Sequence, residues 1–449
     1  MPPGAVPASS AEREHEVTLD EALSIAVLLQ QRGRLDDAEK IYRAVLEGIP
    51  EHADASHFLG VLAHQRGDDA EAAALIEALL ARFPDNADAW SNLGIVRRSA
   101  GQLGLAAEAF RRAIALDARH ANAYSNLAIL LRAEGRIEEA EAAYRQAIAI
   151  DPEHARAWHN LGVLLEGRGQ VPEAVQAYCR ATVLEPGNAE AKRLLAHAYC
   201  TLGELPKAIE VLESWLASEP AHPIATHLLA ACCGENVPGR ASDACVESMF
   251  DSFASSFDAK LQRLRYQAPQ LVARVLSESL PPPAKGLLIA DLGCGTGLCG
   301  PLLAPYAREL VGVDLSVGML ERARERAVYD ELVREELSGY LARHDARFDV
   351  IVSADTLVYF GELGNVLAAM ARALRPGGIS AFTLEKAADE PASGYRLETH
   401  GRYTHAEGYV RGLLAALHLD PLIVNVELRM EAGRPVAGML VRTMRRSGD

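Results

Sequence analysis

Three glycines at alternate positions form the stretch of this chain best suited to binding a ligand. They are Gly293, Gly295 and Gly297, and they follow a short apolar run that ends on Asp291. Such a run is consistent with a buried strand, and glycine permits positive φ and close approach of a ligand to the backbone. The helix expected next, over residues 298–309, would offer its first N–H groups to a negatively charged group. We therefore predict a ligand-binding loop between a strand and a helix.

A second acidic residue, Asp314, stands at the end of the next apolar run, residues 310–313. In a strand–helix–strand unit, a carboxylate at this point can accept hydrogen bonds from ribose hydroxyls. One ligand that fits the pattern is a dinucleotide, whose G-x-G-x-x-G loop precedes an acidic residue by roughly 20 positions. The separation here is 314 − 293 = 21, but Leu298 occupies the position of the last glycine. The other ligand that fits is S-adenosylmethionine (SAM).

The run from Asp291 to Gly297 resembles the first motif, D/E-x-G-x-G-x-G, of class I SAM-dependent methyltransferases. Asp291 belongs to that motif and has no counterpart in the dinucleotide motif, so we favour SAM as the cofactor. The resemblance implies that the three glycines hold the methionine part of SAM, that Asp291 lies near its ammonium group and that Asp314 binds both ribose hydroxyls. The runs F-D-V-I at 348–351 and L-R-P-G-G at 374–378 resemble later motifs of the same class.

Two adjacent glutamates, Glu335 and Glu336, lie at the end of the strand expected over residues 331–337, and one of them is a candidate for the adenine of SAM. We choose Glu336 for a contact with the adenine amino group. Because side chains alternate along a strand, only one of Glu335 and Glu336 can face the ligand, and the sequence does not decide between them. Either residue could instead be a solvated loop acid.

The methyl acceptor is expected beyond the fourth strand, residues 348–355, because ligands meet at the carboxyl ends of strands in this fold. Asp355 is a candidate general base or acceptor clamp, with a capping or solvated carboxylate as the alternative, and Tyr359 is a candidate acceptor contact. The class's nucleic-acid amino methylases carry D/N-P-P-Y/F at this place, whereas this chain has Ser353-Ala354-Asp355-Thr356. That difference argues against methylation of adenine or cytosine amino groups.

A loop is predicted before the last helix, over residues 401–405, and it contains basic and aromatic residues. Arg402 and Tyr403 could hold an anionic acceptor, and His405 could remove a proton from it. The alternative is a plain surface loop without a role in catalysis.

The first half of the chain repeats with a period of 34 residues. Glycines recur at this interval at Gly33, Gly67, Gly101, Gly135, Gly169 and Gly203. With alanines and prolines in the same register, the pattern resembles the tetratricopeptide repeat (TPR), which has this period. The resemblance implies six helix pairs, at 19–52, 53–86, 87–120, 121–154, 155–188 and 189–222, followed by a capping helix. Because one pair cannot bury its apolar face alone, the pairs are expected to stack into an α-solenoid.

The same slot of three consecutive repeats holds an asparagine, at Asn92, Asn126 and Asn160. Each lies two residues after an aromatic residue that should point into the stack. One residue turns a helix by about 100°, so we expect the asparagines to face away from the stack. An asparagine offers both a donor and an acceptor, which suits an extended peptide backbone. The array looks similar to those of protein O-linked sugar transferases, which implies a protein or peptide partner. The alternative is that asparagine is merely tolerated on an exposed helix.

Bulk composition excludes several classes of function. The 449 residues carry a net charge of −16, so we expect no nucleic-acid partner and no binding to anionic membrane surfaces. Seven cysteines without a C-x-x-C pair indicate neither a metal site nor a disulfide framework. The first residues lack the pattern of a signal peptide, and no apolar run is long enough to span a membrane. We therefore expect a cytoplasmic protein without a metal, of undetermined oligomeric state.

The predicted organisation is a flexible tail (1–18), a TPR array with its capping helix (19–234), a linker (235–248) and a SAM-dependent methyltransferase domain (249–446). The fold class is thus an α-solenoid joined to a Rossmann-like α/β domain with seven strands. We predict a methyltransferase whose array recruits a protein substrate or partner. The alternatives are a small-molecule methyltransferase that uses the array for oligomerisation or placement, and a non-enzymatic scaffold. The acceptor atom cannot be read from the sequence.

Overall fold

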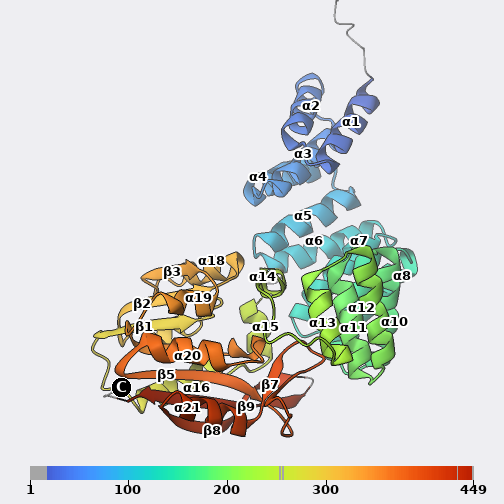
Figure 1. The fold of residues 1–449 in the computed structure, drawn as a ribbon. Coiled ribbons are helices and arrows are strands. Elements are labelled where there is room, and N and C mark those ends of the chain that lie inside the picture. The colour runs from blue at the N-terminus through green and yellow to red at the C-terminus, as the bar shows by residue number, and fades with distance from the viewer. Residues whose placement is uncertain (1–17, 252–253, 255–256, 432, 447–449) are drawn as a thin grey trace, which may run out of the picture. The chain divides into compact units, whose positions relative to one another are not determined.

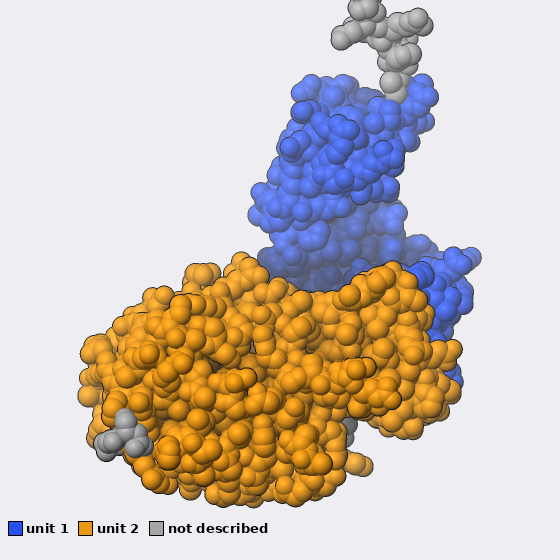
Figure 2. Space-filling model, in the orientation of Figure 1, with its two compact units in different colours: residues 1–168, 176–186 blue, residues 169–175, 187–449 orange. Residues whose placement is uncertain are grey.

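The computed structural model describes residues 18–251, 254, 257–431 and 433–446. The expected tail therefore lies almost wholly outside the described residues. The chain divides into two compact units, one of residues 1–168 and 176–186 and one of residues 169–175 and 187–449 (Figure 2). We describe each unit by itself.

Paired helices with the 34-residue period make up the first unit, so the prediction of a TPR array is confirmed. The helices are α1 (Leu19–Gln31), α2 (Leu35–Gly48), α3 (Ala53–Gln65), α4 (Asp69–Arg82), α5 (Ala87–Ser99), α6 (Leu103–Leu116), α7 (Ala121–Ala133), α8 (Ile137–Ile150) and α9 (Ala155–Gly167), with α10 (Val171–Leu184) at its end. The first helix of a pair ends at a glycine with positive φ, such as Gly101 at 75°. Only a residue without Cβ adopts this conformation at little cost.

Small residues allow the two helices of each pair to pack closely. A Cβ atom added to Gly94 of α5 would lie 2.5 Å from the ring of Phe110 of α6. Gly162 and Tyr178 show the same relation two repeats later, again at 2.5 Å. Phe110 and Tyr178 are fully buried, so each glycine makes room for the aromatic residue that fills the core of its own pair.

The second unit begins with helices that continue the repeat pattern. They are α11 (Ala189–Thr201), α12 (Leu205–Ser218) and α13 (Pro223–Cys233), followed by α14 (Asp243–Asp251), α15 (Phe257–Arg263) and α16 (Ala268–Ser277). Of the expected linker 235–248, residues 235–237 are exposed, whereas Ala241 and Cys245 are buried. Phe250 belongs to α14 and Phe257 begins α15.

A nine-stranded sheet forms the rest of the second unit (Figure 1). Its strands are β1 (Leu287–Leu292), β2 (Ala307–Asp314), β3 (Glu331–Arg334), β4 (Phe348–Ser353), β5 (Leu374–Lys386), β6 (Tyr395–Leu397), β7 (Tyr403–His405), β8 (Leu419–Glu431) and β9 (Arg434–Arg445). The parallel strands run in the order β3-β2-β1-β4-β5, and β9 pairs antiparallel with both β5 and β8. These seven strands are the predicted Rossmann-like methyltransferase sheet, and the short pair β6 and β7 adds two strands that we did not predict.

Apolar cores lie on both faces of this sheet, because successive residues of a strand point to opposite faces. Leu288, Ala290 and Leu292 of β1 belong to one core, together with helices α19 (Leu337–Ala342), α20 (Gly364–Ala373) and α21 (Glu407–Ala416). Ile289, between them, belongs to the other core, with α16 and α17 (Gly300–Leu303). Burial on both faces fixes β1, and with it the start of the glycine loop.

The helix after the glycine loop is shorter than we predicted. Helix α17 covers only Gly300–Leu303, whereas the expected range was 298–309. Pro305 favours the early end, because a proline has no N–H group to donate to a further turn of the helix. Strand β2 begins soon after, and helix α18 (Val317–Glu325) follows it. In the described part of the chain, no helix is long and apolar enough to cross a membrane.

Candidate active site

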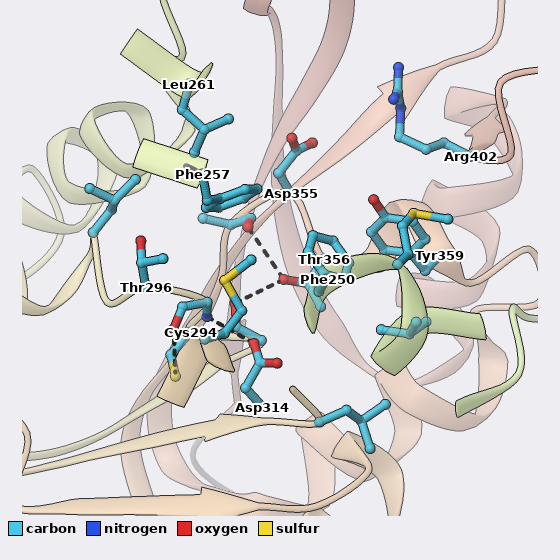
Figure 3. Close-up of a pocket in the computed structure, with 18 of the residues that line it drawn as sticks. Phe250, Phe257, Leu261, Cys294, Thr296, Asp314, Asp355, Thr356, Tyr359 and Arg402 are labelled. Carbon is cyan, nitrogen blue, oxygen red and sulfur yellow. Dashed lines mark hydrogen bonds between the residues drawn. The ribbon is translucent and has the colours of Figure 1, made fainter. Parts of the chain in front are cut away.

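The candidate active site is a cavity of about 260 Å³ within the second unit, at the carboxyl ends of β1, β2 and β4. The loops after these strands form one side, and α14 and α15 contribute aromatic and apolar residues. Arg193 of α11 and Leu228 of α13 also line the cavity, so the sixth repeat and the capping helix take part in its wall. Figure 3 shows Asp314, Cys294 and Thr296 in one part of the cavity and Tyr359 and Arg402 in another.

A glycine is required at position 293, where the loop passes close to the residues that follow β4. Gly293 has a φ of +65°, and a Cβ atom added there would lie 2.2 Å from the Thr356 side chain. The Thr356 hydroxyl donates a hydrogen bond of 3.2 Å to the carbonyl oxygen of Gly293. The loop is thereby held against β4, with Gly293 and Gly295 exposed to the cavity.

Asp291 lies in the cavity wall and is almost completely buried, at 1% exposure. Burial raises the pKa of its carboxyl group to about 7, against the effect of a hydrogen bond from the Tyr329 hydroxyl, which is 2.7 Å long. A positive group near this carboxyl would lower its pKa again, because the positive charge favours the ionised form. The ammonium group of SAM is one such positive group.

Asp314 is held by two backbone N–H groups. Gly295 donates to its Oδ2 at 2.8 Å and Ser316 donates to its Oδ1 at 2.9 Å. Burial raises the pKa of the Asp314 carboxyl, and the N–H groups of Ser316 and Gly295 oppose this rise. The carboxylate therefore has a fixed orientation at the end of β2 and retains lone pairs for two ribose hydroxyls.

The structure distinguishes the two adjacent glutamates. Glu336 lines the cavity, caps α19 by accepting from the Gly339 N–H at 2.9 Å, and has a buried Oε1 with no hydrogen-bond partner among the described residues. Glu335 forms an ion pair with Arg343 and does not line the cavity. Of the two, only Glu336 could contact a ligand in this cavity.

These residues together fit SAM. Gly293 and Gly295 of the loop, the buried carboxyl of Asp291 and the fixed carboxylate of Asp314 all line the cavity, whereas Gly297, which we also predicted, packs against Tyr329 and does not line it. Leu315 and Leu337, next to Asp314 and Glu336, add apolar surface for a flat ring. The unpartnered oxygen of Glu336 would gain a donor from an amino group, which removes the cost of leaving a buried acceptor unsatisfied.

Asp355 occupies the acceptor side of the cavity in an unusual backbone conformation. Its φ is +60°, in the left-handed region that few residues other than glycine adopt. The Asp355 N–H donates to the Thr383 hydroxyl at 2.8 Å, and Arg429 donates to its Oδ2 at 2.7 Å. Its Oδ1 is buried and has no hydrogen-bond partner within the described part of the chain. Burial raises the pKa of the Asp355 carboxyl, and Arg429 opposes this rise.

A cluster of buried ion pairs fixes Arg429, the residue that donates a hydrogen bond to Asp355. Arg429 contacts Glu385, donates to Glu431 at 2.7 Å and, like Glu385, has a side chain only 3% exposed. Arg402 donates to Glu385 at 2.5 Å and to Glu431 at 2.8 Å. Burial raises the pKa of Glu431, but the two arginines outweigh it and bring the value to about 2. The acids are thus ionised, and the cluster fixes the side chain of Arg429 that orients Asp355.

Sequence reasoning missed most of this cluster. We selected Arg402, which does line the cavity, but not Arg429 or Glu431, which also line it. Both residues lie in the β8–β9 hairpin region, about 75 positions after Asp355, and no local motif marks them. Tyr359 lines the cavity as predicted, with its ring edge-on to Phe250 at 5.4 Å between centroids.

The roles expected for His405 and Tyr403 do not agree with their positions. Residues 403–405 form strand β7 and not a loop, and both side chains are completely buried and absent from the cavity wall. The Nε2 atom of His405 lies 2.9 Å from the carbonyl oxygen of Phe360, and burial lowers the pKa of His405 to about 4. The Tyr403 hydroxyl donates to the carbonyl oxygen of Pro238 at 2.6 Å. Both side chains therefore belong to the packing of β7.

The three asparagines of the first unit differ in their surroundings. The Nδ2 atom of Asn92 lies 2.7 Å from Nε2 of His57, in the preceding repeat. Asn126 is only 6% exposed and accepts a 3.5 Å hydrogen bond from Arg98, whereas Asn160 is half-buried. Asn126 is thus less accessible than we expected for a residue that faces away from the stack.

The fold and the cavity define a class I SAM-dependent methyltransferase domain that shares its chain with a TPR array. Residues 289–378 match the family model described as "Methyltransferase domain". Residues 4–233, about half of the chain, match the model described as "Cilia and flagella-associated protein 70 C-terminal domain", a TPR family. The chain belongs to this TPR family, and its second half contains a class I SAM-dependent methyltransferase domain.

Several curated proteins named as methyltransferases are similar to part of this chain. Human "Methyltransferase-like protein 27" is 42% identical over 84 residues, which cover 18% of this chain and 34% of the relative. The "Malonyl-[acyl-carrier protein] O-methyltransferase" of Pseudescherichia vulneris is 32% identical over 138 residues, or 31% and 52% of the two chains. The "Trans-aconitate 2-methyltransferase" of Paracidovorax citrulli is 31% identical over 128 residues, or 28% and 46%. The chain spans about half or less of the length of these relatives.

Proposed function

We propose that the protein transfers the methyl group of SAM to an acceptor that loses a proton to Asp355, and that the TPR array recruits the protein that is, or carries, this acceptor. The proposal that Asp355 accepts the proton rests on the surroundings of its two carboxylate oxygens. Asp355 lines the cavity, one of its carboxylate oxygens is held by Arg429, and the other is buried without a hydrogen-bond partner among the described residues. An acceptor O–H or N–H group would supply the missing donor.

The residues of this chain divide the work between binding and proton transfer. Asp291, Asp314 and Glu336 would hold the ammonium group, the ribose and the adenine of SAM, which supplies an activated methyl group when bound. Alignment of the two reactants contributes most of the rate in such a displacement, up to roughly 7–11 kcal/mol. Asp355 accepts the proton that a neutral acceptor must lose, and its raised pKa makes it a better base than an ordinary aspartate.

Two observations support a protein-borne acceptor. The first half of the chain is an array of helix pairs, and such arrays offer extended surfaces to partners. One relative is named for malonyl-[acyl-carrier protein], an acceptor that is carried by a protein. The three asparagines stay our candidates for the partner surface, with Asn92 and Asn160 more accessible than Asn126.

The second candidate function is methylation of a free small molecule. A cavity of about 260 Å³ that must also receive SAM leaves limited room for an acceptor. Another relative is named for trans-aconitate. In this case the array would serve to localise the enzyme or to form oligomers, and it would not bind the substrate.

Radiolabelled SAM distinguishes the two candidates. The full chain is incubated with labelled SAM and an extract of cells that contain its acceptor, and the label is measured in protein bands and in the low-mass fraction. Label in protein that depends on Asn92 and Asn160 supports recruitment by the array, whereas label confined to the low-mass fraction supports a small molecule.

The role of Asp355 is tested in the same assay by Asp355→Asn, which keeps the size of the side chain and removes the base. We expect at least about a 100-fold loss of turnover, as is usual for removal of a general base, with SAM affinity unchanged. Glu335→Gln is the matched control, because Glu335 lies outside the cavity. Undiminished turnover of Asp355→Asn would contradict the proposed base.

A further inference from the structure

Two cysteines that are far apart in the sequence face each other in the second unit. Cys200 lies near the end of α11 and Cys232 near the end of α13, and their Sγ atoms are 3.5 Å apart. Both side chains are half-buried. The seven cysteines of the chain all lie in its described part, and no disulfide links any of them. The distance is that of two thiols in contact, and a disulfide would bring the sulfur atoms to about 2.05 Å.

The pair lies directly behind the wall of the active site. A small cavity of about 20 Å³ is lined by both cysteines, by Thr399 and by residues that also line the SAM and acceptor cavity. The shared residues are Arg193, Leu228 and His400. Next to them, Nε2 of His227 of α13 lies 2.9 Å from the carbonyl oxygen of Gly401, which precedes Arg402. The positions of α11 and α13 therefore affect the acceptor side of the active site.

The Cys200 thiol differs chemically from its partner and from the buried thiols of the chain. The hydrogen bond with Cys232 lowers the pKa of Cys200 to about 7, and His197 and Thr399 act in the same direction against burial. The same hydrogen bond raises the pKa of Cys232. By contrast, burial raises the pKa of Cys245, Cys294 and Cys299. Since the thiolate is the form that reacts with oxidants, Cys200 is poised to react first.

We propose that Cys200 and Cys232 form a redox-active dithiol that hydrogen peroxide converts into a reversible disulfide. The Cys200 thiolate attacks one peroxide oxygen, the O–O bond breaks, and the departing hydroxide takes up a proton to leave as water. The Sγ atom of Cys232 then attacks the resulting sulfenic sulfur, loses its proton, and the S–O bond breaks to release a second water. The two sulfur atoms lose two electrons in total and the peroxide gains them.

The new bond would restrain α11 and α13 next to the acceptor wall and leave the glycine loop untouched. Because the SAM residues lie on other elements, we expect oxidation to leave SAM affinity within about twofold, or roughly 0.4 kcal/mol. Hydrogen exchange should slow in the peptides that contain α11, α13 and residues 397–402, where the restraint acts. This inference adds a modification site and does not depend on the identity of the acceptor.

The test uses the full chain treated with hydrogen peroxide and digested without reductant. We expect mass spectrometry to find a peptide pair joined through Cys200 and Cys232, which dithiothreitol separates. Cys200→Ser and Cys232→Ser should each abolish the pair. Cys233→Ser is the matched control, because Cys233 is adjacent to Cys232 but exposed, and it should leave the pair intact.

A second measurement keeps the inference testable even if a variant does not fold. In the untreated wild-type chain, iodoacetamide should alkylate Cys200 faster than Cys179, which is also half-buried, with a midpoint near pH 7. Absence of the joined peptide after peroxide, a pair formed through Cys233 instead, or equal alkylation of Cys200 and Cys179 would each overturn the proposal.

Discussion

Binding of SAM should depend on pH through Asp291. Burial keeps the pKa of this carboxyl at about 7, so the acid is largely protonated at pH 6 and largely ionised at pH 8. Only the ionised form can pair with the ammonium group of SAM. The apparent affinity of a ligand falls by the fraction of the protein that is competent to bind it. That fraction is about one tenth at pH 6 and about nine tenths at pH 8, so we expect SAM to bind about tenfold more weakly at pH 6.

The variant Asp291→Asn isolates this effect. An amide resembles the protonated acid and cannot ionise, so it should bind SAM weakly at both pH values, near the level of the wild-type protein at low pH. Any pH dependence that remains in the variant comes from other groups, including those of SAM itself. Glu335→Gln, outside the cavity, should show the same tenfold change as the wild type.

Titration calorimetry at pH 6 and pH 8, in two buffers with different protonation enthalpies, measures both affinity and proton release. For the wild type we expect about one proton released per SAM bound at pH 6 and almost none at pH 8. If Asp291→Asn and the wild type show the same slope of affinity with pH, Asp291 does not pair with the ammonium group and its assignment is wrong.

The same carboxyl links stability to pH. Its pKa in the folded protein lies above the ordinary value of 3.8, so the folded state without SAM holds a proton that the unfolded chain has lost. The contribution of this group to the free energy of unfolding is therefore greatest below about pH 4 and falls as pH rises to about 7. Asp291→Asn should remove this part of the decline, which thermal unfolding across that pH range can measure.

Three further predictions concern other residues. Asp314→Ala should weaken SAM binding by about 1.5–3 kcal/mol, the value of hydrogen bonds to a charged group, or about 10- to 150-fold by calorimetry; an unchanged affinity would exclude the ribose contact. His405→Ala should lower the melting temperature and leave SAM affinity within about twofold. Because the pKa of His405 is lowered to about 4 in the folded protein, the stability that the wild type gains from the neutral imidazole should be lost as pH falls from about 6.5 towards 4. A variant with normal stability but lost turnover would restore a catalytic role for His405. A fragment that starts at Gly187, where the longer stretch of the second unit begins, should bind SAM like the full chain. A fragment that starts near Ala241 should lose stability, since it lacks His227 and Leu228. Equal melting temperatures of the two fragments would show that the sixth repeat and the capping helix do not support the site.

The cofactor side of the site could be predicted because its residues act locally. The glycine loop and Asp314 each occupy a defined point of one strand–helix–strand unit, and the sequence shows both the strand ends and the spacing. The same local rule led to Asp355, at the end of β4. Glu335 and Glu336 could not be separated, because their difference depends on the partner of Glu335, Arg343, which no periodicity specifies.

Part of the acceptor side depends on pairings between distant strands, and there sequence reasoning misplaced Tyr403 and His405. Residues 403–405 pair with β5 and β6, which buries His405 and Tyr403, whereas a loop would have exposed them. Arg429 reaches Asp355 only because β8 and β9 fold back on β5. A chain read segment by segment contains no signal for such contacts.

The contact between His227 and Gly401 has a consequence for how this kind of gene can change. TPR arrays lengthen and shorten by tandem duplication and deletion, usually with little harm because each repeat touches only its neighbours. Here α13 approaches Gly401 so closely that a Cβ atom on that glycine would lie 3.1 Å from Leu228. Duplications upstream of residue 187 would leave this fit alone, while recombination within residues 189–233 would have to preserve it. Among descendants of this gene we therefore expect copy number to vary towards the start of the array and the final helices to be inherited together with the catalytic half.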